Sequence, residues 1–232
     1  MVHGDVLDSE MTWSEQRELA DHRQLLLVDR RGFGQSPDVE GEDFEVDAAD
    51  IADLLPTGAH LVGHSYGGVV SLLAAARRPD AVRSLTVVEP PAFGLVRGRS
   101  DVEAFISTVE RVVEADPSPA EFLPQFLTAV GVDPGRLPDP LPPPLVRHAA
   151  TQLHGRWPWE AEIPLDTLAG AALPTLVVSG GHSAMFDAVC DVLEARFGAQ
   201  RVVIPGAGHT VPSTGRPFNE ALSAFWDQVE RA

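Results

Sequence analysis

The sequence predicts an α/β fold: a mostly parallel sheet with helices on both faces and a helical insertion. Short apolar runs, such as residues 84–89 and 174–179, lack the alternation of a half-exposed strand, which is typical of strands buried in a parallel sheet. Helix-like segments separate these runs, and that order places helices on both faces of the sheet. The pattern stops over residues 92–166, so we expect a core of residues 1–91 and 167–232 around an insertion.

The first part of the core contains two further apolar runs, residues 24–29 and 59–62, which are predicted strands. Residues 14–21 are expected to form a short helix. Residues 44–55 carry apolar side chains at helical spacing, and Pro56 ends that helix. The second part contains a last strand at residues 201–204, and amphipathic helices are expected at residues 186–196 and 219–231.

The insertion is rich in proline. Residues 101–114 place apolar side chains on one helical face. Ser118 and Glu121 match a capping box, with a proline at the first helical position. Five prolines between residues 137 and 144 indicate a stiff connector, and residues 145–154 are expected to form another short helix.

A serine lies between a strand-like run and a helix-like run, in the segment Gly63-His64-Ser65-Tyr66-Gly67. This segment fits the pattern G-x-S-x-G, in which a sharp strand-to-helix turn strains the serine and exposes its hydroxyl. The helix start behind the serine presents free N–H groups to negative charge. Read without its surroundings, the segment would be only a close-packed turn.

Three further blocks accompany that segment in order: His3-Gly4 near the start, DRRGFGQS at residues 29–36, and Gly206-Ala207-Gly208-His209 near the end. Together the four blocks resemble the α/β-hydrolase fold, and within it the serine hydrolases of the esterase and haloperoxidase-like type. The resemblance covers nearly the whole chain. It implies that residues 92–166 form a cap over the site, that the loop at residues 29–36 is structural, and that Arg31 binds loop carbonyl groups.

The resemblance also implies the site residues. Ser65 is the nucleophile, and His209 is the base that takes its proton, with His182 as the nearest rival. The oxyanion would be held by the backbone N–H groups of Asp5 and Tyr66. An acidic residue beside an oxyanion is unexpected, so the Asp5 side chain should point away from it.

The sequence offers more than one candidate for the acid of the triad. The usual position, three residues after Gly180, is occupied by Ser183. Some relatives carry the acid after the strand that follows the elbow helix, and Glu89 stands there. Asp187 and Asp191 come later, on a predicted helix. We favour Glu89, with Asp187 as the alternative.

The start of the chain offers only three residues for a strand that lies within the sheet in this family. A central strand this short leaves neighbouring backbone groups unpaired. We therefore expect either that the start codon is misassigned or the N-terminus lost, or that the sheet is reduced.

The composition narrows the choice of partners. The net charge of −17 argues against nucleic acid and anionic membranes. One cysteine, Cys190, excludes an intrachain disulfide. No signal peptide, metal-ligand spacing or phosphate-binding glycine pattern is present, so we expect a cytoplasmic protein without a cofactor.

Three functions remain in competition. The first is hydrolysis of a small-molecule carboxylic ester or related acyl bond through an acyl-enzyme on Ser65. The second is a lyase or isomerase that uses the same residues without an acyl-enzyme. The third is a non-catalytic protein that binds a small molecule. The sequence identifies neither the substrate nor the oligomeric state.

Overall fold

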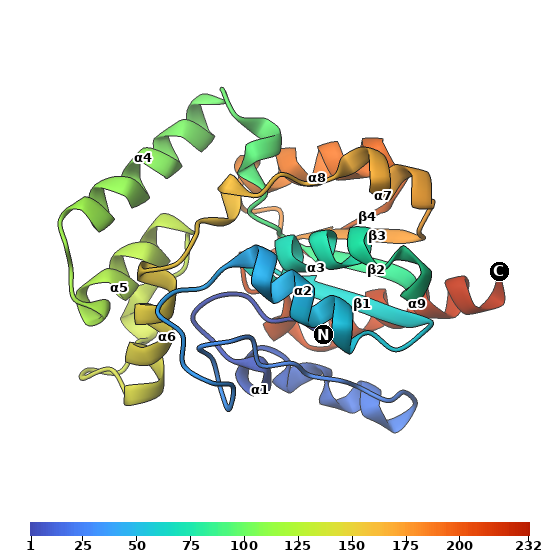
Figure 1. The fold of residues 1–232 in the computed structure, drawn as a ribbon, viewed down its shortest axis with the longest axis horizontal. Helices are drawn as coiled ribbons and strands as arrows, with labels where there is room; N and C mark the ends of the chain where they lie inside the picture. Colours follow the sequence, from blue (N-terminus) through green and yellow to red (C-terminus); the bar gives the residue numbers. More distant parts are fainter.

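The centre of the computed structural model is a sheet of four parallel strands in the order β1-β2-β3-β4 (Figure 1). The structure describes residues 1–232, apart from the side chain of Arg136. The strands are β1 (Ala59–His64), β2 (Val82–Val88), β3 (Thr175–Ser179) and β4 (Gln200–Val203). Every residue of β3 is buried, as are all but one residue of β2. The predicted parallel sheet is confirmed.

Helices connect and cover the strands. Their bounds are α1 (Ser9–Thr12), α2 (Phe44–Leu54), α3 (Tyr66–Arg77), α4 (Ser100–Glu114), α5 (Pro119–Ala129), α6 (Pro143–Leu153), α7 (Leu165–Ala171), α8 (Ala184–Phe197) and α9 (Arg216–Arg231). Residues 14–21, predicted to be a helix, form a 3₁₀ helix. The capping box at Ser118 and Glu121 forms as predicted.

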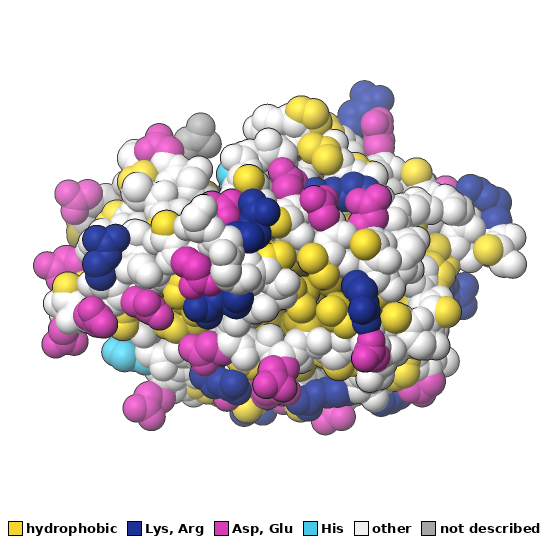
Figure 2. Space-filling view, turned by 90° about the horizontal axis from the view of Figure 1, so that it is seen from above, with side chains coloured by type: hydrophobic (Ala, Val, Ile, Leu, Met, Phe, Trp, Pro, Cys, Tyr) yellow, Lys and Arg dark blue, Asp and Glu magenta, His cyan; other side chains and the backbone are white. Residues whose placement is uncertain are grey.

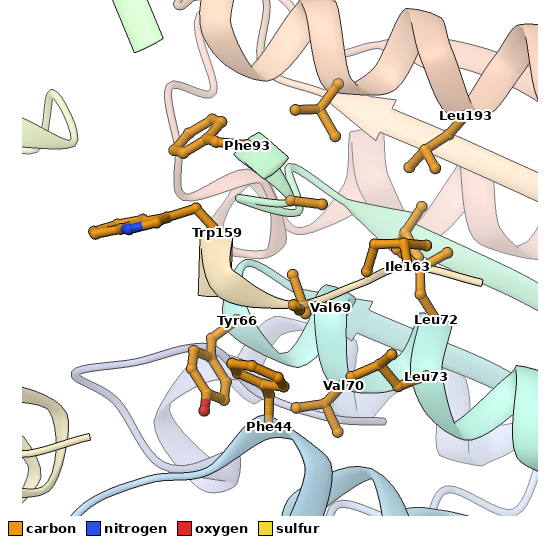
Figure 3. Packing of buried hydrophobic residues seen from close by; sticks show 14 of the residues in the cluster. Phe44, Tyr66, Val69, Val70, Leu72, Leu73, Phe93, Trp159, Ile163 and Leu193 are labelled. Carbon is orange, nitrogen blue, oxygen red and sulfur yellow. The ribbon is translucent and has the colours of Figure 1, made fainter. Parts of the chain in front are cut away.

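The two faces of the sheet pack into different apolar clusters, because side chains alternate along each strand. Leu61, Val87 and Val177 belong to a main cluster with residues of α2, α3 and α8. Figure 3 shows part of this cluster, with Phe44 of α2, Val70 and Leu72 of α3 and Leu193 of α8. On the opposite face, a second cluster contains Val62, Val88, Leu176 and Val178 with residues of α9. Helices therefore cover both faces.

The segment of residues 24–29 was predicted to be a strand, and this prediction is wrong. Val2 forms single parallel bridges to Val28 and to Gly63, so the start of the chain lies between β1 and residue 28. The N–H of Val2 donates to the carbonyl of Val62 at 2.8 Å, and the N–H of Val28 donates to the carbonyl of Met1 at 3.2 Å. One paired residue on each side is too few for a ladder, and Leu26 is 52% exposed.

The insertion consists of α4, α5 and α6, which gather at one side of the molecule (Figure 1). The apolar face of α4, including Phe105 and Val109, joins the main cluster. By contrast, the buried apolar side chains of α5 and α6 form a third cluster around Phe122, Leu123 and Leu145, and Val112 and Val113 of α4 pack against it. The insertion therefore has one helix whose apolar face lies in the main cluster and two helices whose buried apolar side chains form a smaller cluster beside it.

The surface is strongly acidic overall, with a net charge of −17. On the face in Figure 2, Asp and Glu side chains are scattered among arginines and do not gather in one patch. Within the described chain, every helix falls short of the length and apolar character needed to cross a bilayer.

Candidate active site

Ser65 alone makes the turn between β1, which ends at His64, and α3, which begins at Tyr66. Its backbone angles are φ 53° and ψ −126°, a strained conformation for a residue with a side chain. The flanking glycines explain how the turn closes. A Cβ on Gly63 would lie 2.2 Å from the carbonyl oxygen of Gly67, and one on Gly67 would lie 2.3 Å from the carbonyl oxygen of His3.

We therefore expect Gly67→Ala to destabilise the protein by about 2 kcal/mol or more, because the new methyl group must displace backbone atoms. Urea denaturation measures this loss. Gly170→Ala is the matched control: it also lies in a helix, and a Cβ there would have nothing within 4 Å. The control should gain up to about 1 kcal/mol. Equal stability of Gly67→Ala and wild type would contradict the close approach at residue 67.

Three side chains from separate parts of the chain form a continuous hydrogen-bonded line. The Nε2 atom of His209 lies 2.9 Å from the Oγ of Ser65, and its Nδ1 atom lies 2.8 Å from Glu89 Oε2. His64 pairs with Val88 in the ladder, so Ser65 and Glu89 leave adjacent strands side by side. His209 arrives on the loop after β4. The structure thus brings together the serine, the histidine and the favoured acid.

Glu89 lies fully buried at the end of β2. Burial by itself would raise the pKa of Glu89. Hydrogen bonds from His182 and His209, the charge of His209 and the Gly180 N–H outweigh it and lower the pKa to about 2. The Gly180 N–H donates to Oε1 at 2.7 Å, and His182 Nδ1 lies 3.3 Å from the same oxygen. The carboxylate is therefore ionised at neutral pH.

The alternative candidates for the acid do not contact His209 through a described hydrogen bond. Asp187 accepts hydrogen bonds from the Ser179 hydroxyl at 2.7 Å and from Arg201 at 2.8 Å. Asp191 is exposed on α8, and Ser183 precedes the first residue of that helix. The described hydrogen bonds of His209 therefore involve Glu89 and neither aspartate.

The structure also shows support for His209 that the sequence did not predict. The Nε2 of His64 donates to the carbonyl of His209 at 2.8 Å, and the two ring centroids are 5.1 Å apart. Burial, reinforced by the charge of His209, lowers the pKa of His64 to about 3, so His64 stays neutral. Its place inside the elbow, next to Ser65, is the only signal in the sequence that could have indicated this role.

The turn at His3-Gly4 lies directly against the elbow. A Cβ on Gly4 would be 2.8 Å from the Cβ of Ser65. The Asp5 carboxylate is drawn into an ion pair with Arg30 at 2.9 Å. Arg31, which was expected to bind loop carbonyl groups, instead pairs with Asp50 and is half exposed. The neighbouring Arg30 binds the carbonyl groups, at His3 and Gly4.

Glu89, His182 and His209 are the described residues that offer grouped metal ligands, with ligand atoms within 4.8 Å of one another. Their contacts to one another, described above, account for this closeness.

Comparison with known proteins identifies the family of the chain. Residues 1–221 match the model of the alpha/beta hydrolase family. The sn-1-specific diacylglycerol lipase ABHD11 of Mus musculus is 30% identical over 88% of this chain and 71% of its own length. A pimeloyl-[acyl-carrier protein] methyl ester esterase of Aeromonas salmonicida is 38% identical, over 40% of this chain and 38% of its own. A thermophilic esterase from Thermogutta terrifontis superposes with a TM-score of 0.71 at 27% identity, covering 98% of this chain and 88% of that one. The chain is therefore a hydrolase and belongs to the alpha/beta hydrolase family.

Proposed function

We propose that the protein is a serine esterase that cleaves a small-molecule carboxylic ester or related acyl bond through an acyl-enzyme on Ser65. The observation that carries the proposal is the hydrogen-bonded line from Ser65 through His209 to the buried, ionised Glu89. A serine hydroxyl is a weak nucleophile until an adjacent base takes its proton, and this line supplies the base and the group that orients it.

In the proposed reaction, Ser65 Oγ attacks the acyl carbon while its proton passes to His209 Nε2. His209 then returns that proton to the leaving alcohol, and the acyl group stays on Ser65. Water attacks the acyl-enzyme and gives its proton to His209. Ser65 leaves with that proton, which releases the carboxylic acid and restores the enzyme. Glu89 accepts from Nδ1 throughout, fixes the tautomer and stabilises the charged imidazole.

The oxyanion is held by the N–H groups of Tyr66 and Asp5 in this proposal. Tyr66 is the first residue of α3, where the N–H has no acceptor within the helix. The N–H of Asp5 donates to no acceptor in the part of the chain that the structure describes. Both residues lie next to Ser65. Tyr66 follows it in the sequence, and Asp5 follows Gly4, which packs against the Cβ of Ser65.

Residues 92–166 act as a cap in the proposal. Contacts between this insertion and the loops around the site support it. The His148 ring on α6 lies 2.9 Å from the carbonyl of Val6 and accepts from the Gly34 N–H at 3.3 Å. Val6 and Leu7, just after Asp5, pack against the cluster of α5 and α6. Such a cap excludes water and selects the substrate.

The test is detection of the acyl-enzyme. Mixing the protein with a p-nitrophenyl ester should release a burst of p-nitrophenol, and the mass of the protein should rise by one acyl group. Digestion should locate that group on the peptide containing Ser65. Turnover without any acyl adduct would favour a lyase or isomerase, and neither turnover nor labelling by a fluorophosphonate would favour a binding protein. The relatives act on a diacylglycerol or an acyl-carrier-protein ester by name, so a panel of glycerides, short esters, lactones and thioesters is the next measurement.

A further inference from the structure

Behind the turn at residues 3–5, the guanidinium of Arg30 is completely buried. It pairs with three carboxylates: Asp5 at 2.9 Å, and Glu42 and Asp47 at 2.8 Å each. A buried arginine with three acidic partners is costly to desolvate, and an apolar side chain of similar size can often replace such a group without loss of stability. Its contacts with the backbone suggest what else it does.

Arg30 touches both segments that carry the proposed oxyanion donors. Its side chain donates to the carbonyl groups of His3 at 3.3 Å and Gly4 at 3.1 Å. The guanidinium also lies over the ring of Tyr66, 4.3 Å from the ring centroid, at a distance that gives a favourable cation–π contact. One rigid planar group thus joins the N-terminal turn to the first residue of α3.

The bond to Gly4 determines where the Asp5 N–H points. In a trans peptide the C=O and the following N–H point in opposite directions. The carbonyl of Gly4 is held by Arg30 Nη2 and by His3 Nδ1, which lies 2.6 Å away. The N–H of Asp5 therefore faces away from Arg30. Gly4 packs on Ser65. A rotation of the peptide between Gly4 and Asp5 would therefore direct the Gly4 carbonyl oxygen, instead of the Asp5 N–H, toward the proposed oxyanion.

We propose that Arg30 is a positioning residue: it fixes the two backbone N–H groups, of Asp5 and Tyr66, that stabilise the oxyanion. The inference rests on the proposed function. It also explains why an acidic residue is tolerated beside the oxyanion, because the Asp5 carboxylate is bound to Arg30 and serves as an anchor of the turn.

The charges of the cluster provide a matched control. Burial raises the pKa of Glu42 well above its usual range, and it also raises the pKa values of Asp5 and Asp47. Glu42→Gln removes one carboxylate of the cluster, keeps an oxygen that can accept from Arg30, and leaves the bonds from Arg30 to Gly4 and Asp5 in place. It alters the same cluster without releasing the turn.

The experiment compares Arg30→Lys with Glu42→Gln. Lysine keeps the charge but cannot reach Gly4, Asp5 and the other carboxylates at once. We expect kcat to fall about 100-fold or more, the size of losing one oxyanion donor, with KM changed less than about threefold. A boronic acid inhibitor, whose adduct places an oxygen in the oxyanion site, should lose affinity by a similar factor. Glu42→Gln should keep both constants within about threefold.

If Arg30→Lys does not fold, Arg30→Met combined with Asp47→Asn replaces it, because that pair removes one charge of each sign. A folded Arg30 variant with wild-type kcat and boronate affinity would overturn the proposal and leave Arg30 a purely structural role. So would an equal loss in Glu42→Gln. Failure of the proposed function is distinguishable, since the wild-type protein would then form no acyl-enzyme.

Discussion

Ser65→Ala is expected to lower kcat for an activated ester by a factor on the order of 10⁶, since removal of a triad nucleophile leaves only binding and oxyanion contacts. The fold should persist, because the loss of one hydroxyl from a turn leaves no cavity of consequence and the strained backbone remains the same. Rates should be measured at saturating substrate, with circular dichroism and the melting temperature checked alongside.

The matched control for that variant is Ser213→Ala. Ser213 lies exposed in the 3₁₀ helix after the His209 loop, and it undergoes the same chemical change without contact to the site. Its rate should equal that of the wild type. If Ser65→Ala keeps more than a small fraction of the activity, Ser65 is not the nucleophile.

Glu89→Gln should lower kcat by roughly 10⁴, because a neutral amide can neither hold the productive tautomer of His209 nor stabilise its charged form. The hydrogen bond from the Gly180 N–H can persist in the variant, so the geometry should be retained. Because the pKa of Glu89 is about 2, the loss should be uniform from about pH 5 upward. A pH–rate profile of both proteins on one ester tests both points.

Asp187→Asn and Asp191→Asn are the controls for the acid. The Asp187 carboxylate accepts hydrogen bonds from Ser179 and Arg201 and none from His209. Asp187→Asn should therefore lose some stability but little activity. Asp191→Asn should leave both nearly unchanged. If kcat falls severely in Asp187→Asn and stays close to the wild-type value in Glu89→Gln, the acid of the triad is the residue that follows β3.

The sequence predicted the parts of the fold that local patterns control. The strands of the sheet, the capping box of α5 and the elbow at Ser65 all depend on apolar runs or turn residues close in sequence. The position of Ser65 and Glu89 at the ends of adjacent strands could also be anticipated, since consecutive strands tend to be neighbours in a sheet. Their catalytic roles stay a prediction.

Other features depend on contacts between distant residues and were missed. Residues 24–29 look like a buried strand, yet only Val28 finds a partner. His182 was considered only as a rival base, whereas it lies against Glu89. Arg30 and Arg31 are adjacent and chemically identical in the sequence. Which of the two is buried depends on groups distant in sequence. Arg30 meets Glu42 and Asp47 as well as Asp5 and the carbonyl groups of the N-terminal turn.

The separate cluster formed by α5 and α6 has an energetic consequence. Apolar groups that pack mainly on one another form a cooperative unit, which opens at a lower free energy than the whole domain. Here such subglobal opening would leave the packing of the sheet in place, although Val112 and Val113 of α4 would lose neighbours. It would, however, release Val6 and Leu7, the residues that follow Asp5. We therefore expect opening of these two helices to loosen the backbone next to Ser65, and their reclosure to tighten it again.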